Sequence, residues 1–506
     1  MLLIISTLSG NEGCNVYGVT SRDTVSGNYK AIPHHPEILI LMDDKIDNSY
    51  KWRAMLVVSI GVFMATLDGS IVNVALPTLT RYFSTNLNTI QWVLLSYLLT
   101  ITTLLLTLGR LSDMYGKKYI FCGGLLIFTI GSAFCGLSAS SGQLIASRVV
   151  QGIGAAMLMA NGPAIVTQVF PSTERGKALG LIGTVVSIGS MTGPALGGFL
   201  IDLAGWQSIF YINIPIGLAG TVYAMKVLEP DEVHRSQKFD IPGAVLMFVS
   251  VVALMLGITQ GQEMGWGSPV IIVLFTLFIL FLGLFLITEK RARMPIIELD
   301  LFRNKPFSAA NTSGFLSFVA MFSVILLMPY YMEEILGYST KSVGLALMAV
   351  PLIMALVAPL SGWVFDKTNS PLPGSLGMAI TALALFLIAG LNRDSSFLDI
   401  IMRLGLVGLG MGMFQSPNNS IIMGSVRSNR LGIASGMLAT MRNLGMVTGI
   451  AVSAAVFTRS LRLLESTGLA YEPAFIGGFH DAFLVAAVIC LAGVFTSLVR
   501  GGEKLR

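Results

Sequence analysis

The sequence predicts an all-α membrane protein with fourteen spanning helices, and its composition and its long apolar segments support that prediction. Of the 506 residues, 54% are hydrophobic and only 12% are charged. A soluble globular protein carries about 25% charged residues, so this composition excludes the soluble classes. A spanning helix needs about 20 mostly apolar residues. Segments of this kind lie at residues 54–79, 89–109, 118–138, 142–168, 178–201, 208–228, 241–260, 268–288, 308–331, 342–364, 373–391, 398–424, 432–457 and 481–499.

Lysine and arginine residues are distributed unevenly between the predicted loops. With the N-terminus placed inside, 22 of the 32 fall in inner segments and 5 in outer segments. Cytoplasmic loops carry an excess of Lys and Arg, so both termini are expected in the cytoplasm and the chain in the cell (plasma) membrane. The same distribution accounts for the net charge of +5 without a nucleic-acid partner.

The first 41 residues allow two interpretations. The initial run MLLIIS is shorter than the apolar core of a signal peptide, and no clear small-residue cleavage site follows it. Met42 then begins a short charged segment that leads into the first apolar run. Either residues 1–41 are a mis-annotated extension and Met42 is the true start, or residues 1–53 together form a cytoplasmic N-terminal segment.

Two parts of the chain repeat one pattern of residues. Gly109 is followed by Asp113 where one predicted span ends, and Gly362 is followed by Asp366 where another ends, eight spans later. An offset of eight spans indicates two six-helix bundles with an extra pair of helices between them. The predicted domains are residues 54–228 for the first bundle, 241–288 for the inserted pair, 308–499 for the second bundle and 500–506 for a cytoplasmic tail.

Several motifs follow one another along the first bundle. Residues 67–77 read LDGSIVNVALP, residues 148–154 read RVVQGIG and residues 210–217 read FYINIPIG. The loop motif after the second span contains Gly109, Asp113, Gly116, Lys117 and Lys118. The motif in the fifth span contains Gly189, Gly193, Pro194, Gly197 and Gly198.

In this order, and over about residues 54–500, these motifs resemble the major facilitator superfamily in its fourteen-helix drug:proton antiporter branch. The resemblance implies a major facilitator fold, with two six-helix bundles around a central cavity and access that alternates between the two sides. It also implies efflux of an amphiphilic compound in exchange for protons. The proton gradient supplies the energy, no cofactor is needed, and a monomer is expected.

Asp68 is the carboxylate that the sequence places deep within a span. A charged group there costs at least a few kcal/mol, so an intramembrane acid is a functional candidate. Burial disfavours the charged form of a carboxylate, whereas a nearby cation favours it, and the balance lets such a group load and release a proton. We therefore expect proton coupling at Asp68. The alternative is a structural ion pair or a helix cap.

Arg148 is expected to tune the protonation of Asp68. If the first span starts at Ala54, Asp68 lies about 21 Å along it, which is about 9 Å from the outer surface of a ~30 Å apolar core. Arg148 enters from the outer side and reaches the same depth of about 9 Å. In the family that the sequence resembles, the matching arginine is linked with proton coupling. Alternatively, Arg148 extends outward to the membrane surface.

Polar residues in other spans are candidates to line a substrate cavity. Arg442 lies about 15 Å into its span without an evident acidic partner, and a buried guanidinium needs a partner or a water-lined cavity. For the amides, the alternative is hydrogen bonding between helices. For Arg403, the simpler interpretation is a pair with Asp399, four residues earlier. The cavity candidates are Asn73, Gln151, Asn418, Asn419, Arg442 and Asn443.

The two glycine-containing motifs are expected to control conformation without touching substrate. Asp113 is placed to accept from the backbone N–H groups that open a neighbouring helix, and Lys117 and Lys118 to face the negative inner leaflet. The glycines at 189, 193 and 197 form a smooth strip for close packing, and Pro194 allows a kink. The resemblance implies that this strip keeps the inner half sealed.

Several activities lack the residues that they require. The sequence has no Cys/His cluster with metal-ligand spacing, no nucleophile–base constellation and no Walker motif. We therefore expect neither an enzyme, nor a metal protein, nor a consumer of ATP. The expected partners are a small amphiphilic substrate, protons and the lipid bilayer. Alternatives are a dedicated metabolite exporter or a proton-coupled importer of the same fold, or a non-transporting receptor or scaffold.

Overall fold

The computed structural model describes residues 48–171, 174–230, 241–291, 299–368, 370–426 and 431–498. Within these ranges, fourteen helices are long and apolar enough to cross a membrane. The predicted all-α fold with fourteen spans is therefore confirmed. Met42, most of the predicted N-terminal segment and the predicted tail at 500–506 lie outside the described residues.

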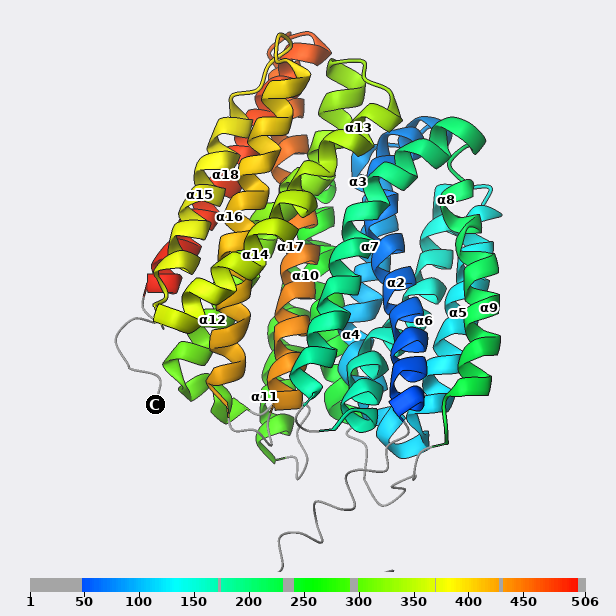
Figure 1. Ribbon diagram of the computed structural model, residues 1–506. Coiled ribbons are helices and arrows are strands. Elements are labelled where there is room, and N and C mark those ends of the chain that lie inside the picture. Colours follow the sequence, from blue (N-terminus) through cyan, green and yellow to red (C-terminus); the bar gives the residue numbers. More distant parts are fainter. Residues whose placement is uncertain are drawn as a thin grey trace, which may run out of the picture. The chain divides into compact units, whose positions relative to one another are not determined.

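The N-terminal half, as we use the term, supplies the first six spans (Figure 1). Its helices are α2 (Asn48–Tyr82), α3 (Leu87–Ile90), α4 (Trp92–Tyr115), α5 (Lys117–Gly136), α6 (Ser141–Val169), α7 (Arg175–Ala204), α8 (Ser208–Tyr211) and α9 (Asn213–Val227). The inserted pair consists of α10 (Ile241–Met264) and α11 (Pro269–Arg291).

The C-terminal half supplies the last six spans, two of which are interrupted. Its helices are η1 (Leu299–Arg303), α12 (Lys305–Tyr330), the π-helical turn η2 (Tyr331–Ile335), α13 (Thr340–Leu347), α14 (Ala349–Thr368), α15 (Leu372–Ala389), α16 (Phe397–Gly424), α17 (Leu431–Ser466) and α18 (Tyr471–Leu498). We call the face where α2 begins and α18 ends the terminal face, and the opposite face the distal face (Figure 1).

Several helices are longer than the predicted spans. The first begins at Asn48 instead of residue 54, α17 continues to Ser466 instead of residue 457, and α18 starts at Tyr471 instead of residue 481. Hydropathy detects the part of a helix that suits lipid, whereas the helix itself continues until the backbone turns. Between α17 and α18 that turn includes Gly468, whose φ of 90° L side chains rarely adopt.

The segment Gly109–Lys118, predicted as a loop motif, is almost entirely helical. The helix α4 continues through this segment to Tyr115, and α5 begins directly after Gly116. Gly116 has a φ of 96°, which suits glycine and allows the chain to reverse within one residue. The side chain of Asp113 lies outside the described residues, so its expected contact with a neighbouring helix stays a prediction.

The buried apolar side chains are arranged differently towards the two faces. Towards the distal face, one continuous cluster joins both halves, with Leu76 from α2 and Phe457 from α17 among its members. Towards the terminal face, the N-terminal half has its own cluster around Phe121, and the C-terminal half has another around Phe307. The two halves are therefore packed together at the distal face and have separate cores at the terminal face.

Polar contacts between the halves occur at the distal face as well. Arg81 of α2 forms an ion pair with Glu333 of η2 at 2.6 Å. One residue earlier, Thr80 shares a hydrogen bond of 2.6 Å with Tyr330 at the end of α12. The ion pair is only partly shielded, because the side chain of Glu333 is 3% exposed but that of Arg81 is 56% exposed. We call the Arg81–Glu333 pair the distal ion pair.

Substitution of Glu333 is expected to weaken closure of the distal face. Because water screens Arg81, the pair should contribute about 1 kcal/mol, so Glu333→Gln should shift the equilibrium towards distal opening by roughly fivefold. Spin labels on the exposed residues Leu137 and Thr467, at the distal ends of the two halves, report this opening as longer distances in pulsed electron resonance.

The matched control is Glu472→Gln. Glu472 pairs with Arg393 at 3.3 Å, but both residues belong to the C-terminal half, so its loss should leave the distance between the halves unchanged. An unchanged distance distribution in Glu333→Gln would show that the distal ion pair does not hold the halves together.

Candidate functional site

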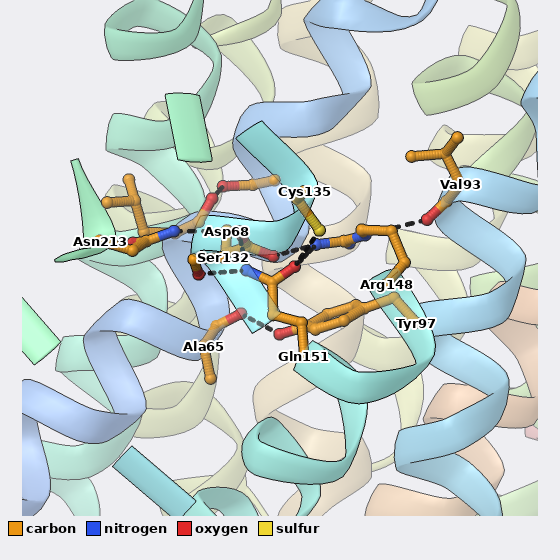
Figure 2. A network of polar contacts seen from close by, with 11 residues as sticks. Ala65, Asp68, Val93, Tyr97, Ser132, Cys135, Arg148, Gln151 and Asn213 are labelled. Atoms are coloured by element: carbon orange, nitrogen blue, oxygen red, sulfur yellow. Dashed lines mark hydrogen bonds and ion pairs between the residues drawn. The ribbon is translucent and has the colours of Figure 1, made fainter. Parts of the chain in front are cut away.

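Asp68 is completely buried in α2 and is surrounded by polar side chains from α6 and α9 (Figure 2). Its carboxylate forms an ion pair with Arg148. It also accepts hydrogen bonds from Nε2 of Gln151 at 2.7 Å and from Nδ2 of Asn213 at 3.1 Å. Arg148 and Gln151 are as completely buried as Asp68. One cation and two neutral donors thus stabilise the carboxylate in a site without exposure to solvent.

Arg148 is fixed by a second set of contacts with α4. Its Nε donates to the carbonyl of Val93 at 3.0 Å. Its guanidinium carbon lies 3.9 Å from the centroid of the Tyr97 ring, which is a cation–π distance. The hydroxyl of Tyr97 in turn donates to the carbonyl of Ala65, one turn before Asp68 on α2, at 2.9 Å. The orientation of Arg148 therefore depends on three helices.

Gln151 connects the charged pair to α5. Its Oε1 accepts from Nη1 of Arg148 at 2.6 Å, and its Nε2 donates both to Asp68 and to Oγ of Ser132, at 2.7 Å each. Arg148 and Gln151 are three residues apart on α6, a spacing that places them on one helix face. Gln151 was predicted to line a substrate cavity. In this conformation the side chain is completely buried and enclosed by its polar partners, so a contact with substrate stays a prediction.

Glycines allow the helices around this network to approach closely. A Cβ at Gly131 of α5 would lie 2.6 Å from the backbone of Gln151, so α5 and α6 nearly touch beside Ser132. A Cβ at Gly152 of α6 would lie 2.9 Å from Thr100 of α4. Small residues at helix interfaces in membranes permit such approaches. The hydrogen-bond distances within the network depend on them.

Tyr97, Ser132 and Asn213 are members of the network that were not predicted from the sequence. An amide inside the apolar span at 208–228 was the available signal for Asn213. Ser132 offers no comparable signal, because a serine hydroxyl within a helix can donate its hydrogen bond to a backbone carbonyl of the preceding turn. Tyr97 resembles any other aromatic residue of an apolar span until its ring is seen beside Arg148.

The glycine strip of α7 packs on the turns of α2 that surround Asp68. Added Cβ atoms at Gly189, Gly193 and Gly197 would meet residues 66–71 of α2. The neighbouring Gly198 faces the other half, where a Cβ would lie 2.9 Å from Lys341 of α13. The resemblance implied a seal in the inner half. The strip lies towards the distal face, because α7 starts at the terminal face and the strip occupies its second half, and the implied seal stays a prediction.

The other cavity candidates lie apart from this network. Nε of Arg442, Nδ2 of Asn443, and Oδ1 of Asn418 and of Asn73 are buried without a hydrogen-bond partner. Asn419 is partly buried. The simpler interpretation of Arg403 agrees with the structure, in which its Nε lies 2.9 Å from Oδ1 of Asp399.

Removal of Arg148 alone is expected to destabilise the protein. Arg148→Met leaves the carboxylate of Asp68 buried without its cation, and breaking a buried pair in this way costs about 3–5 kcal/mol. The thermal unfolding midpoint of the purified protein measures the loss. The double variant Asp68→Asn/Arg148→Met carries no uncompensated charge and should recover much of the stability. If the unfolding midpoint of the double variant fell by the sum of the decreases in the two single variants, this electrostatic explanation would be contradicted.

The close approach of α7 to α2 gives a second prediction. A methyl group at Gly193 would lie 2.8 Å from Cβ of Ser70 and 2.9 Å from the backbone nitrogen of Ile71. Such overpacking costs about 1–3 kcal/mol, so Gly193→Ala should lower the unfolding midpoint. Gly183 of the same helix is the control, because nothing lies within 4 Å of an added Cβ there. Equal effects of the two substitutions would exclude steric contact as the cause.

Comparison with known proteins agrees with this architecture. The family model described as Major Facilitator Superfamily matches residues 58–450. The chain is 36% identical over 449 residues to the riboflavin transporter RibZ of Clostridioides difficile (strain 630), which covers 88% of this chain and 97% of that protein. It is 33% identical over 410 residues to the multidrug resistance protein Stp of Mycobacterium tuberculosis (strain CDC 1551 / Oshkosh). That match covers 81% of this chain and 76% of Stp.

A solved structure shows the same fold. The chain matches a bacterial homologue of the human lysosomal transporter Spinster with a TM-score of 0.66, over 90% of this chain and 98% of that one. The two sequences are 16% identical, so this likeness concerns the fold alone. Together with the family match, these findings show that the chain belongs to the Major Facilitator Superfamily, as a multi-pass membrane transporter and not an enzyme.

Proposed function

We propose that the protein exports amphiphilic compounds, including drugs, across the cell membrane in exchange for protons, with Asp68 as the group that carries the proton. The observation that supports this proposal is the network around Asp68. A single carboxylate is held at full burial by Arg148, Gln151 and Asn213, all within the N-terminal half. An acid in this position is costly in a membrane and marks a proton or substrate pathway.

Protonation of Asp68 would change the contacts of the whole network. A neutral carboxyl group loses the charge that attracts Arg148 and gains one donor in place of an acceptor site. The guanidinium would then be left with Oε1 of Gln151, the Val93 carbonyl and the Tyr97 ring as its main partners. Since Tyr97 is also bonded to Ala65 of α2, a shift of Arg148 is expected to move α2 against α4 and α6.

The glycine strip provides a contact path from Asp68 to the other half. It packs on residues 66–71 of α2, and Ser70 donates a hydrogen bond of 3.2 Å to the carbonyl of Gly189. The adjoining Gly198 packs on α13. Movement of the turn that carries Asp68 is therefore expected to change the contact between α7 and α13, on which distal closure depends.

The packing of the two halves supports a state that opens towards the terminal face. The two halves share one core at the distal face and have separate cores at the terminal face. If the terminal face is cytoplasmic, as the distribution of Lys and Arg predicts, this is an inward-facing state. A gradient of 100 mV supplies about 2.3 kcal/mol per proton, enough to bias an exchange between two such states.

The relatives leave two substrate classes open. One is a riboflavin transporter and another a multidrug resistance protein. Multidrug efflux is our first proposal because of the drug:proton antiporter motifs, and transport of a dedicated metabolite, outward or inward, is the second. Counterflow of labelled riboflavin against labelled drugs in proteoliposomes, with the direction scored, separates them. A scaffold without transport would show no counterflow of any compound.

The decisive experiment compares two kinds of transport in one preparation. Asp68→Asn in proteoliposomes should abolish accumulation driven by a pH gradient but retain counterflow, which needs no net proton movement. Asp481→Asn is the control, because Asp481 is exposed at the far end of the other half. Its accumulation should equal that of the unmodified protein. Full gradient-driven accumulation by Asp68→Asn would end the proposal that Asp68 carries the proton.

A further inference from the structure

We propose that the transported substrate carries an anionic group, such as a carboxylate, and that this group binds Arg442 of α17. The inference rests on the proposed transport function and adds the chemical class of the substrate. The two halves differ in how the charge of their arginines is compensated. In the N-terminal half the buried arginine has a buried acid as its partner. In the described part of the C-terminal half, Arg442 has no such partner.

The acids of the C-terminal half whose side chains the structure describes belong to its distal part. Glu333 pairs with Arg81, Asp399 with Arg403 and Glu472 with Arg393. The others accept hydrogen bonds from hydroxyl groups, Glu334 from Tyr471 and Asp481 from Ser460, or are exposed, as Glu465 is. Arg442 lies about three helical turns from the start of α17 at the terminal face, and therefore far from this group of acids.

Helix geometry directs Arg442 to the boundary between the halves. Gly445 and Gly449 face α12, where added Cβ atoms would meet Phe315 and Val319. Ala439 instead packs on the apolar cluster of the N-terminal half. At about 100° per residue, Arg442 points roughly 40° from the direction of the two glycines and roughly 60° from that of Ala439. Its side chain therefore lies between α12 and the N-terminal half, where the two halves have separate cores.

The neighbouring amides supply unsatisfied polar atoms at the same level. Nδ2 of Asn443, a residue 3% exposed, is a buried donor without a partner, as is Nε of Arg442. Asn418 of α16 reaches the same level, because its amide nitrogen lies 3.2 Å from the position of a Cβ at Gly314. Gly314 precedes Phe315, the residue that faces Gly445. The guanidinium of Arg442 and the amide of Asn443 are thus two unsatisfied donors at one level of α17.

An anionic group would satisfy the guanidinium of Arg442 and compensate its charge. An unpaired donor in a buried site costs about 1–3 kcal/mol, and more if it is charged. A carboxylate or phosphate matches the planar guanidinium through paired N–H···O bonds. A cationic compound would gain nothing from these donors and would be repelled by Arg442. The site accordingly selects acidic amphiphiles over cationic drugs.

The test uses a matched pair of probes, 1-pyrenebutyrate and 1-pyrenebutyramide, which share ring and chain and differ in charge. Binding to the full chain in nanodiscs is measured by fluorescence anisotropy, with empty nanodiscs subtracted. We expect the carboxylate to bind about tenfold more tightly than the amide, as for hydrogen bonds to a charged group. Arg442→Gln should abolish this preference, and Arg442→Lys should restore part of it.

The control is Arg462→Gln, which removes one positive charge from an exposed position of the same helix. It should leave the preference unchanged, and unfolding midpoints show whether each variant is folded. Equal binding of both probes to the unmodified protein, or a full preference in Arg442→Gln, would overturn the inference. Neither result bears on proton coupling, because binding is measured without a gradient. Conversely, if Arg442→Gln loses the preference, the anion site at Arg442 remains supported even when Asp68→Asn retains full gradient-driven transport.

Discussion

The packing of the N-terminal half depends on the buried ion pair between Asp68 and Arg148. Two charges removed from water are costly, and their attraction offsets that cost only if hydrogen bonds satisfy the remaining donors and acceptors. Gln151, Asn213 and the Val93 carbonyl meet most of this requirement, and Nη2 of Arg148 is the guanidinium nitrogen that stays buried without a hydrogen-bond partner. These partners belong to different helices, so the pair also fixes how α2, α4, α6 and α9 pack together.

The same constraint connects the charged site to the movement between the halves. The turns of α2 that flank Asp68 rest on the glycine strip of α7, and the neighbouring face of α7 rests on α13. Because the residues of α7 at this contact are glycines, α7 has no side chains there that could absorb a small shift of α2. Because packed interfaces switch between discrete arrangements and do not deform continuously, a change in charge at Asp68 is well placed to favour one arrangement over another.

The two halves distribute charge differently, which suggests a division of tasks. In the N-terminal half, acid and arginine compensate one another, and the site is closed to solvent. In the described part of the C-terminal half, Arg442 lies without an acid at the boundary with the other half. A compensated pair suits a proton that comes and goes, whereas an uncompensated cation suits a ligand that supplies the missing charge.

The sequence by itself determined the fourteen helices, because a chain in lipid must satisfy its backbone internally and long apolar segments can do so only as helices. It also placed Asp68 and Arg148 at one depth, since depth follows from the rise per residue. Only the tertiary structure decided which faces meet. The spans are apolar on nearly all sides, so their pattern does not fix the rotation of each helix about its axis. Rotation and close glycine contacts brought Ser132 and Asn213 into the network, enclosed Gln151 and placed the glycine strip towards the distal face.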